Sequence, residues 1–467
     1  MTKYKVVSLF SGAGGLDIGL EATGRFVVVA AVDSDPAACE TLRLNRDAGR
    51  TACREMRVYE MDIKALEPER VMEDLGLAPG ELDLLAGGPP CQTFSSAGKR
   101  GSVQDTRGTL IWDFLRFVEV MRPKFFLMEN VRPLLSAAVR HRPLAQRPER
   151  GGPPLAEDER PGSVLRLFLA DVPEEYRVDI FEVNAVNYGA PQLRERVFFV
   201  GNRFNALVDL PEPTHLAPEA CEALARSGSL FAGACRPWRT LGEALAGLRE
   251  ESPEVMDFSP RKKRYLEMVP PGGNWRSLPE EVAKESMGRA FYAKGGRSGW
   301  WRRLSLDLPC PTLVTMPNHA STSLCHPLET RALSVREYAR IQEFPDEWAF
   351  AGRTADKYRL IGNAVPVRLA RVVGEAVARA LDEVVARGFA PWPQKRPRFR
   401  RVYLQSHVRT RRWFDGGEVY TWKDGEENGK ARYGVPKTGR KETILDKEVE
   451  QVAKALEIKR HQRTLAK

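Results

Sequence analysis

Short, nearly continuous apolar runs alternate with amphipathic segments along the first two hundred residues. The runs end at glycine, proline or an acidic residue, and their unbroken apolar character is typical of strands buried on both faces. Strands that alternate with helices predict right-handed β–α–β units and a doubly wound, mostly parallel α/β sheet. The predicted strands are residues 4–10, 26–33, 57–63, 82–88 and 124–131, and the predicted helices are 16–24, 36–45, 108–123 and 163–172.

The pattern changes twice further along the chain. Residues 176–189 and 194–201 predict a final strand pair, and after Asn202 the periodicity weakens while Pro, Trp and Gly become frequent. A long amphipathic segment near residue 375 predicts a helix that packs back on the first domain, with a shorter helix before it at 334–344. We therefore predict four parts: a sheet domain at 1–201, a smaller loop-rich domain at 202–329, a returning segment at 330–390 and a basic extension at 391–467.

Two segments do not fit this plan. Residues 140–162 are rich in Pro, Arg and Gly and predict an exposed loop. The extension begins with a basic linker, “PWPQKRPRFRR”, and is followed by two candidate strands at 418–422 and 431–435 and an amphipathic helix at 443–460. The pattern assigns no role to either segment.

The length and composition limit the classes of protein to which this chain can belong. A chain of 467 residues is long enough for two or three domains. No apolar run approaches the ~20 residues of a membrane span, and the first residues do not resemble a signal peptide. Seven cysteines without CxxC spacing argue against a disulfide framework and against a structural zinc site, so we expect a cytoplasmic protein that binds no metal.

The excess of positive charge lies at the C-terminal end of the chain. The net charge is +10, and residues 391–467 hold 20 basic and 10 acidic residues, which accounts for the whole excess. A polyanion such as nucleic acid is one partner that this charge suits. A solvated tail without a partner is the alternative.

A glycine-rich turn, “FSGAGG”, follows the first predicted strand and opens a helix. Gly12 and Gly14 would let a ligand come close to the backbone at the carboxyl edge of the sheet. Asp33 ends the second strand about twenty residues later, where an acid can bind a ribose, and Asp62 ends the third. These features favour an adenosine-type cofactor over a plain tight turn.

Three further motifs carry reactive side chains. “PPCQ” places Cys91 on a rigid turn at the end of the fourth strand, where a thiolate could act as a nucleophile. “MENV” places Glu129 at the end of the fifth strand, where a buried acid needs a partner. “QLRERVFFVG” places Arg194 and Arg196 on one face of a strand, as a pair that could bind an anion or a carbonyl oxygen.

These motifs, in this order, resemble those of the DNA (cytosine-5)-methyltransferase family of the bacterial restriction-modification type. The matching segments are “FSGAGG”, “GGPPCQTFSSAGKR”, “RGTL”, “MENV”, “QLRER”, “RALSVREYARIQEFPDEW” and “YRLIGNAVP”. The resemblance implies a doubly wound sheet with a smaller target-recognition domain. It also implies methyl transfer from S-adenosylmethionine to carbon 5 of a cytosine in a specific duplex DNA sequence.

The resemblance assigns chemistry to the catalytic residues. Cys91 would attack carbon 6 of a flipped-out cytosine, and Glu129 would stabilise N3 and bind the exocyclic amine. Arg194 is the candidate for positive charge near the thiol, and Arg196 would bind O2. Loss of the carbon 5 proton and elimination of the thiol would then release 5-methylcytosine.

The resemblance also implies cofactor and DNA contacts. The cofactor residues would be Phe10, Gly12, Gly14, Asp33, Asp62, Ile63, Leu110 and Asn363. Ser34 stands where some members have a bulky aromatic against the adenine, so Ile63 is expected to supply that contact. The expected DNA contacts are Ser95, Lys99 and Arg107 in the loop after Cys91, and Arg302 and Arg303 in the target-recognition domain. Trp300 and Trp301 could instead form the core of that domain, with solvated arginines beside them.

The expected partner is double-stranded DNA, bound by a monomer. A cognate restriction endonuclease is compatible with the family but implies no stable complex. Two alternatives remain: an RNA cytosine-5 methyltransferase, against which the sizeable second domain argues, and a non-catalytic DNA-binding relative, against which the presence of both Cys91 and Glu129 argues.

Overall fold

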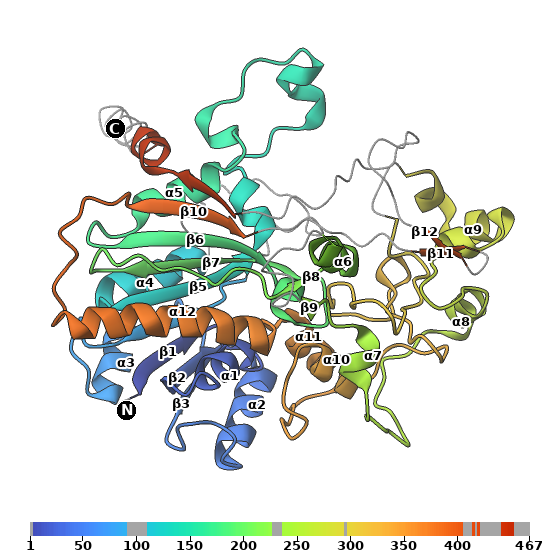
Figure 1. The fold of residues 1–467 in the computed structure, drawn as a ribbon, viewed down its shortest axis with the longest axis horizontal. Helices are drawn as coiled ribbons and strands as arrows, with labels where there is room; N and C mark the ends of the chain where they lie inside the picture. The colour runs from blue at the N-terminus through green and yellow to red at the C-terminus, as the bar shows by residue number, and fades with distance from the viewer. Residues whose placement is uncertain are drawn as a thin grey trace.

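The computed structural model describes residues 3–90, 110–226, 236–293, 297–404, 413–415, 418–420 and 440–452. Nine of the strands in these residues form one large twisted sheet (Figure 1). They are β1 (Tyr4–Leu9), β2 (Phe26–Asp33), β3 (Arg57–Glu60), β4 (Leu84–Gly87), β5 (Phe125–Val131), β6 (Arg177–Asn184), β7 (Glu195–Asn202), β10 (Phe399–Leu404) and β13 (Arg440–Ile444).

The order of the strands across the sheet is β13-β10-β6-β7-β5-β4-β1-β2-β3. All neighbouring pairs are parallel except those made by β7 and β13, which are antiparallel to their neighbours. The predicted fold class, a doubly wound and mostly parallel sheet, is therefore confirmed, and so is the predicted strand pair β6–β7. As a result, β7 begins at the edge of the sheet where β4, β5 and β6 end.

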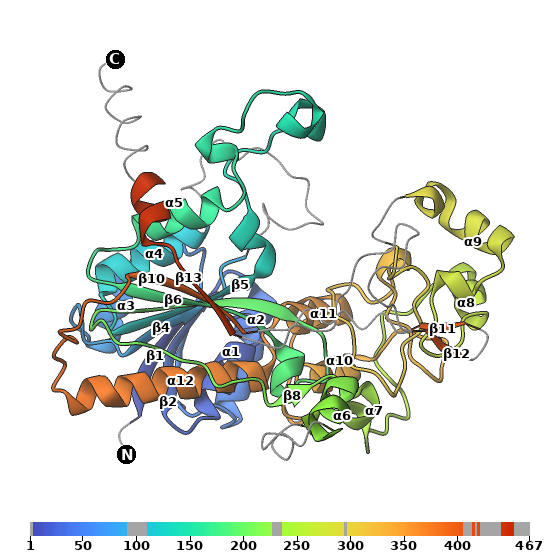
Figure 2. The ribbon, with the colours of Figure 1, turned by 45° about the horizontal axis from the view of Figure 1, so that its top comes forward.

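Helices cover both faces of the sheet (Figure 2). In the described part of the chain none is long and apolar enough to cross a membrane. The helices are α1 (Gly15–Glu21), α2 (Pro36–Asp47), α3 (Pro68–Leu75), α4 (Leu110–Met121), α5 (Ser163–Asp171), α6 (Pro218–Arg226), α7 (Leu241–Leu245), α8 (Pro260–Glu267), α9 (Glu280–Met287), α10 (Val335–Ile341), α11 (Thr354–Asn363) and α12 (Val367–Ala386). One apolar core includes residues of α1, α2 and α12, and a second core, on the opposite face, includes residues of α3, α4 and α5. The sequence pattern did not predict α3.

Helix α12 packs back on the first domain, as predicted, and crosses α1 at very close range. A Cβ atom on Gly19 would lie 2.4 Å from the Cβ of Ala370, and one on Gly374 would lie 2.9 Å from the side chain of Leu20. Glycine is therefore required on both helices because any side chain there would push them apart. This contact joins the first helix of the chain to the last helix of its core.

The described residues between 202 and 329 form mainly short helices and loops that lie beside the sheet, on the right of Figure 1. Part of this region has a small apolar core of its own, in which Trp301 packs against Tyr265. The segment 140–162 contains only short 3-10 turns among its described residues, in agreement with the predicted loop. A carboxylate within it, Glu159, is buried and paired with Arg142.

The extension after residue 390 differs from its prediction. Strand β10, expected as part of a basic linker, pairs in parallel with β6, and β13 then pairs antiparallel with β10. The predicted helix at 443–460 begins instead as the end of β13, and helix is described only at residues 446–452. Of the two predicted strands, one corresponds to β12 (Glu418–Tyr420), which pairs with β11 (Trp413–Asp415); residues 431–435 lie outside the described part of the chain.

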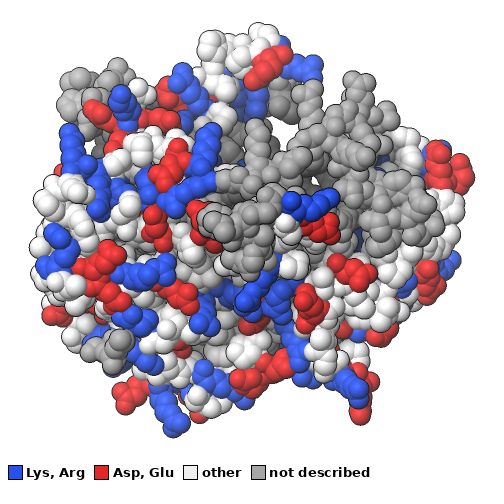
Figure 3. Space-filling model, in the orientation of Figure 1, with Lys and Arg blue, Asp and Glu red and all other residues white. Residues whose placement is uncertain are grey.

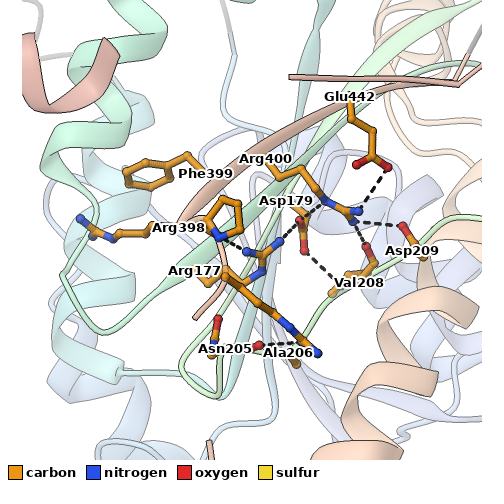
Figure 4. A network of polar contacts seen from close by, with 12 residues as sticks. Arg177, Asp179, Asn205, Ala206, Val208, Asp209, Arg398, Phe399, Arg400 and Glu442 are labelled. Atoms are coloured by element: carbon orange, nitrogen blue, oxygen red, sulfur yellow. Dashed lines mark hydrogen bonds and ion pairs between the residues drawn. The ribbon is translucent and has the colours of Figure 1, made fainter. Parts of the chain in front are cut away.

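The basic residues of β10 bind acidic groups within the molecule. Asp179 of β6 is fully buried, and its Oδ1 lies 2.6 Å from Nη2 of Arg177 and 2.7 Å from Nε of Arg400 (Figure 4). The backbone N–H of Val208 donates to Oδ2 at 3.0 Å. Burial raises the pKa of Asp179, and the two arginines act in the opposite direction. A buried carboxylate of this kind requires its cations, so β10 is part of the sheet domain.

For the described residues of the extension, this pairing differs from the alternative of a solvated tail, and the hypothesis of a polyanion partner stays a prediction. Arg398 donates to the carbonyl oxygens of Val172, Pro173 and Tyr176, and Arg440 pairs with Asp209. On the face drawn in Figure 3, Lys and Arg lie interspersed with Asp and Glu over the part that holds the sheet. The charge of these tail residues is therefore used within the fold and is not presented as one basic surface.

Replacement of Arg400 by methionine is expected to lower the stability of the protein strongly. The change leaves the buried Asp179 with one cation in place of two, and removing a partner from a buried ion pair costs about 3 kcal/mol or more. Arg440→Met is the matched control, because its half-exposed pairs contribute at most about 1 kcal/mol. Urea unfolding followed by tryptophan fluorescence measures both midpoints; equal midpoints for the two variants would show that β10 is dispensable.

Candidate active site

The candidate active site lies at the edge of the sheet where its parallel strands end. Strand β5 ends there with “MENV”, and the antiparallel strand β7 begins there, preceded by “QLR”. Val131 lies opposite Arg196 in the register, and Glu129 lies opposite Phe198. Glu129 and Arg196 are therefore diagonal neighbours on the same face of the sheet.

Glu129 and Arg196 form a buried ion pair. The distance from Nε of Arg196 to Oε1 of Glu129 is 2.7 Å, and each residue is 8% exposed. Burial raises the pKa of Glu129, while the charges of Arg196 and Arg194 oppose this rise. The acid consequently holds a proton more readily than an exposed glutamate, with a cation beside it.

The turn that leads to Cys91 is attached to the strand of Glu129. A Cβ atom on Gly88 would lie 3.1 Å from Oε2 of Glu129, and Nδ2 of Asn130 donates to the carbonyl oxygen of Pro89 at 3.0 Å. Cys91 lies outside the described residues, as do Ser95, Lys99 and Arg107. The last described residues before Cys91 are therefore fixed against the acid. The motif “MENV” contains Asn130, but its hydrogen bond was not predicted.

Arg194 has a different set of contacts from the one expected. Its side chain is buried, and it donates to the carbonyl oxygens of Leu313 at 3.2 Å and Gly362 at 2.8 Å. Burial lowers its pKa well below the usual value. The guanidinium thus joins the start of β7 to α11 and to the loop that contains Leu313. These contacts indicate positioning of the backbone as its immediate role, although its charge still acts on Glu129.

Two buried glutamines strengthen the same junction. Nε2 of Gln192 donates to Oε1 of Gln342 at 2.6 Å, and Nε2 of Gln342 donates to the carbonyl oxygens of Ile361 and Ala364. Both side chains are fully buried, so their hydrogen bonds are costly to break. The motifs “QLRER” and “RIQEF” contain these glutamines, but no spacing in the sequence indicates that they pair.

The glycine-rich loop takes the backbone conformation that a close ligand requires. Phe10 and Gly12 have φ values of 55° and 54°, and a Cβ atom on Gly12 would meet nothing within 4 Å. The N–H of Gly12 donates to Oδ2 of Asp33 at 2.8 Å. Burial raises the pKa of Asp33, and hydrogen bonds from backbone N–H groups oppose that rise. The space above Gly12 and the acid beside it fit the approach of an adenosine cofactor.

The other predicted cofactor residues differ in accessibility. Asp62 is exposed and accepts the N–H of Lys64, and Asn363 is exposed at the end of α11. The next residue, Ala364, packs against Gly15 at the start of α1, which places Asn363 near the loop. Ile63 is only 4% exposed and belongs to the apolar core on the α4 face. Most of its side chain is therefore committed to the core. Leu110, at the start of α4, is half-buried against the same core.

Trp348 supports the glycine-rich loop, and sequence reasoning assigned it no role. Its Nε1 donates to the carbonyl oxygen of Ala13 at 3.1 Å, and its ring would lie 3.3 Å from a Cβ atom on Gly14. Gly14 also has a φ of 83°, so both space and backbone conformation require glycine there. The segment “FPDEW” resembled a family motif, but only the fold shows what the tryptophan contacts.

The arginines predicted to contact DNA in the second domain are used internally. Nε of Arg302 donates to the carbonyl oxygen of Ser323, and Arg303 donates to the carbonyl oxygen of Val269 and the hydroxyl of Thr330. Burial lowers the pKa of Arg302. These contacts hold the loops of the second domain together, and Trp301 is part of its core. The expectation that Arg302 and Arg303 contact DNA stays a prediction.

Comparison with known proteins identifies the class of this fold and site. Residues 4–144 and 169–379 match the family described as “C-5 cytosine-specific DNA methylase”. The chain is thus a methyltransferase that uses S-adenosylmethionine. It belongs to the C-5 cytosine-specific DNA methylase family, and its activity is DNA (cytosine-5) methyl transfer.

Characterised relatives cover most of the chain. It is 37% identical to the type II methyltransferase M.Sau96I of Staphylococcus aureus over 81% of its length and 77% of the relative's. It is 38% identical to the type II methyltransferase M.Eco47II of Escherichia coli, over 82% and 80% respectively. A solved structure described as a prophage-encoded DNA modification methyltransferase (E. coli) has 24% identity and a TM-score of 0.52. It covers 81% of this chain and all of that one, and it supports the fold.

The replacement Trp348→Phe is expected to weaken S-adenosylmethionine binding about fivefold. It keeps an aromatic ring under the loop but removes the hydrogen bond to Ala13, which contributes about 1 kcal/mol. Trp392→Phe is the control, because Trp392 packs against Arg387 and Arg396, away from the loop. Isothermal titration of each variant with the cofactor alone gives the affinities, and an unchanged affinity for Trp348→Phe would exclude this support.

Proposed function

We propose that the chain methylates carbon 5 of a flipped-out cytosine through a covalent bond between Cys91 and carbon 6. The observation that supports this most directly is the buried Glu129–Arg196 pair, because the turn before Cys91 is bound to the same strand through Asn130. This attachment supports the proposal that the nucleophile and the acid act on one base. No group in this position could reach carbon 6 inside a duplex, so the base must leave the stack, at a cost of a few kcal/mol.

Each residue has a defined part in the proposed reaction. Attack by the Cys91 thiolate forms the sulfur–carbon 6 bond and sends an electron pair into the ring. Glu129 in its protonated form donates at N3, which stabilises that charge and leaves carbon 5 nucleophilic. Arg196, adjacent to Glu129, is placed to donate to O2 of the base. After carbon 5 is methylated, loss of its proton returns the electron pair and expels the thiolate.

The cofactor supplies an electrophilic methyl group when it is bound. Gly12 allows close approach of the ligand, Asp33 can accept a hydrogen bond from a ribose hydroxyl, and Asp62 and Asn363 present exposed polar groups nearby. Burial of the loop against Trp348 keeps it in one conformation. These residues bind and orient, whereas Cys91, Glu129 and Arg196 act on the base.

The proposed substrate is duplex DNA with a specific sequence, bound by a monomer. The relatives described as type II methyltransferases support a modification role beside a restriction endonuclease. The second domain, residues 202–329, is proposed to recognise the sequence. Because Arg302 and Arg303 also donate hydrogen bonds within that domain, we propose that further residues of the domain contact the bases with them.

Duplex DNA with 5-fluorocytosine at the target position is expected to trap a covalent adduct with the wild-type protein. Fluorine cannot leave carbon 5 as the proton does, so the thiol is not expelled. Adduct is measured by denaturing gel electrophoresis and intact mass spectrometry, with Cys91→Ser as the negative variant. Full methyl transfer by Cys91→Ser would overturn the covalent mechanism.

Glu129→Gln is expected to lower kcat by about 10²- to 10⁴-fold, the usual contribution of a general acid. The raised pKa of Glu129 also predicts the pH dependence: the protonated acid is present at low pH, and activity declines as pH rises through that pKa. The pH profile of single-turnover methyl transfer should therefore lose its alkaline decline in the glutamine variant. A glutamine variant with the wild-type profile would assign the decline to another group.

Substrate class is tested by comparing methyl transfer to duplex DNA and to transfer RNA. We expect incorporation into DNA alone, because the chain carries a substantial second domain. Bisulfite sequencing of a plasmid from cells that express the protein would then reveal the recognised sequence. Incorporation into transfer RNA instead would favour the RNA alternative.

A further inference from the structure

A chain of ion pairs connects the C-terminal extension to the catalytic edge of the sheet. Nε of Arg401, on β10, lies 2.5 Å from Oε1 of Glu182, on β6. Nε of Arg132 lies 3.2 Å from Oε2 of the same glutamate, and Nη1 of Arg132 lies 3.7 Å from Oε2 of Glu195. The four charges alternate in sign and link β10 to the ends of β6, β5 and β7.

This chain of ion pairs lies on the opposite face of the sheet from the acid. Glu182 lies opposite Val197 in the register, and the side chain of Val197 belongs to the core on the α4 face. Arg196, one residue earlier, points to the other face, where it meets Glu129. The ion pairs and the Glu129–Arg196 pair thus occupy two faces of the same sheet edge.

The last two members of this chain of ion pairs, Arg132 and Glu195, lie close in sequence to the catalytic pair. Arg132 follows Glu129 by three residues, at the start of the turn that ends β5. Glu195 directly precedes Arg196, whose Nη1 also donates to the carbonyl oxygen of Glu195 at 2.7 Å. The pairing of Arg132 with Glu195 therefore constrains the backbone on both sides of the catalytic pair.

Glu182 is the central member, and it depends on the extension. It is only 4% exposed, and one carboxylate oxygen contacts Arg132 while the other contacts Arg401. Without Arg401, the buried carboxylate of Glu182 would have only Arg132 as a cationic partner. Arg132 would then move toward Glu182 and away from Glu195. The match to the family ends at residue 379, so Arg401 lies beyond the part of the chain that the family shares.

We propose that Arg401 is a positioning residue for methyl transfer, which acts through Glu182 and Arg132 on the Glu129–Arg196 pair. This inference rests on the proposed role of Glu129. Arg401 is about one-third exposed, in contrast to the neighbouring Arg400, which is buried against Asp179. Its replacement is therefore expected to affect the reaction more than the fold.

Arg401→Gln is the test variant, Arg401→Lys is the conservative rescue, and Arg440→Gln is the matched control. Arg440 is also a paired arginine of the extension, but its partners Asp209 and Glu442 do not contact the catalytic edge. We expect kcat of Arg401→Gln to fall about 5- to 20-fold, less than the ~10²-fold effect of a 1 Å misplacement, with KM for DNA within twofold. Arg401→Lys is expected to recover most of the rate, and Arg440→Gln is expected to match the wild type.

The pH profile separates positioning from a loss of folded protein. Arg196 and Arg194 are the charged groups that act on Glu129, and both oppose the rise of its pKa caused by burial. If Arg196 is held less closely, the alkaline decline in kcat is expected to move to higher pH in Arg401→Gln. A lower fraction of folded enzyme would reduce kcat equally at every pH.

The outcomes distinguish this inference from the proposed function. If Arg401→Gln has the wild-type kcat and pH profile while Glu129→Gln shows its expected loss of kcat in the same assay, the positioning role alone is overturned. Full activity of Glu129→Gln in the same assay would overturn the proposed role of the acid itself. Glu182→Gln gives an independent check, because it removes the shared carboxylate without changing a residue of the extension, and it is expected to show the same pH displacement.

Discussion

The site depends on one strand that runs against the direction of its neighbours. Because β7 is inserted antiparallel between β5 and β6, its first residues lie at the edge where the parallel strands end. An arginine at the start of β7 can therefore meet a glutamate at the end of β5, and the carboxylate is buried with a cation beside it. In an entirely parallel sheet those two residues would lie at opposite edges. The antiparallel insertion thus makes it possible to bury Glu129.

Much of the sheet could be predicted because its strands are short apolar runs with clear ends. The runs that became β1, β2, β4 and β5 are buried on both faces, and such runs stand out in a sequence. Glu129 stood out for a related reason, since an acid that ends an apolar strand is costly to bury without a partner. To predict that Glu129 pairs with Arg196, one must know the register of β5 and β7, and the sequence does not reveal that register.

The features that were missed depend on partners far away in the sequence. Strand β10 was taken for a linker because its arginines looked solvated, and Asp179, the acid that buries Arg400, lies 221 residues earlier. Arg302 and Arg303 looked available to DNA because their carbonyl partners belong to loops that no periodicity places. Helix α3 was overlooked although Val71, Met72 and Leu75 lie at helical spacing in it. For β10 and for the two arginines, a local pattern was overruled by a tertiary contact.

The contact between Trp348 and Ala13 also determines when, during synthesis, the protein can complete its glycine-rich loop. These residues are separated by 335 positions, and α1 is packed by α12, which follows later still. A nascent or prematurely ended chain can already contain Cys91, Glu129 and Arg196 while its glycine-rich loop has no tryptophan beneath it. Contacts of such long range form late in folding. The proposed nucleophile is therefore made early, but the loop proposed to bind the methyl donor is completed only when most of the chain has left the ribosome.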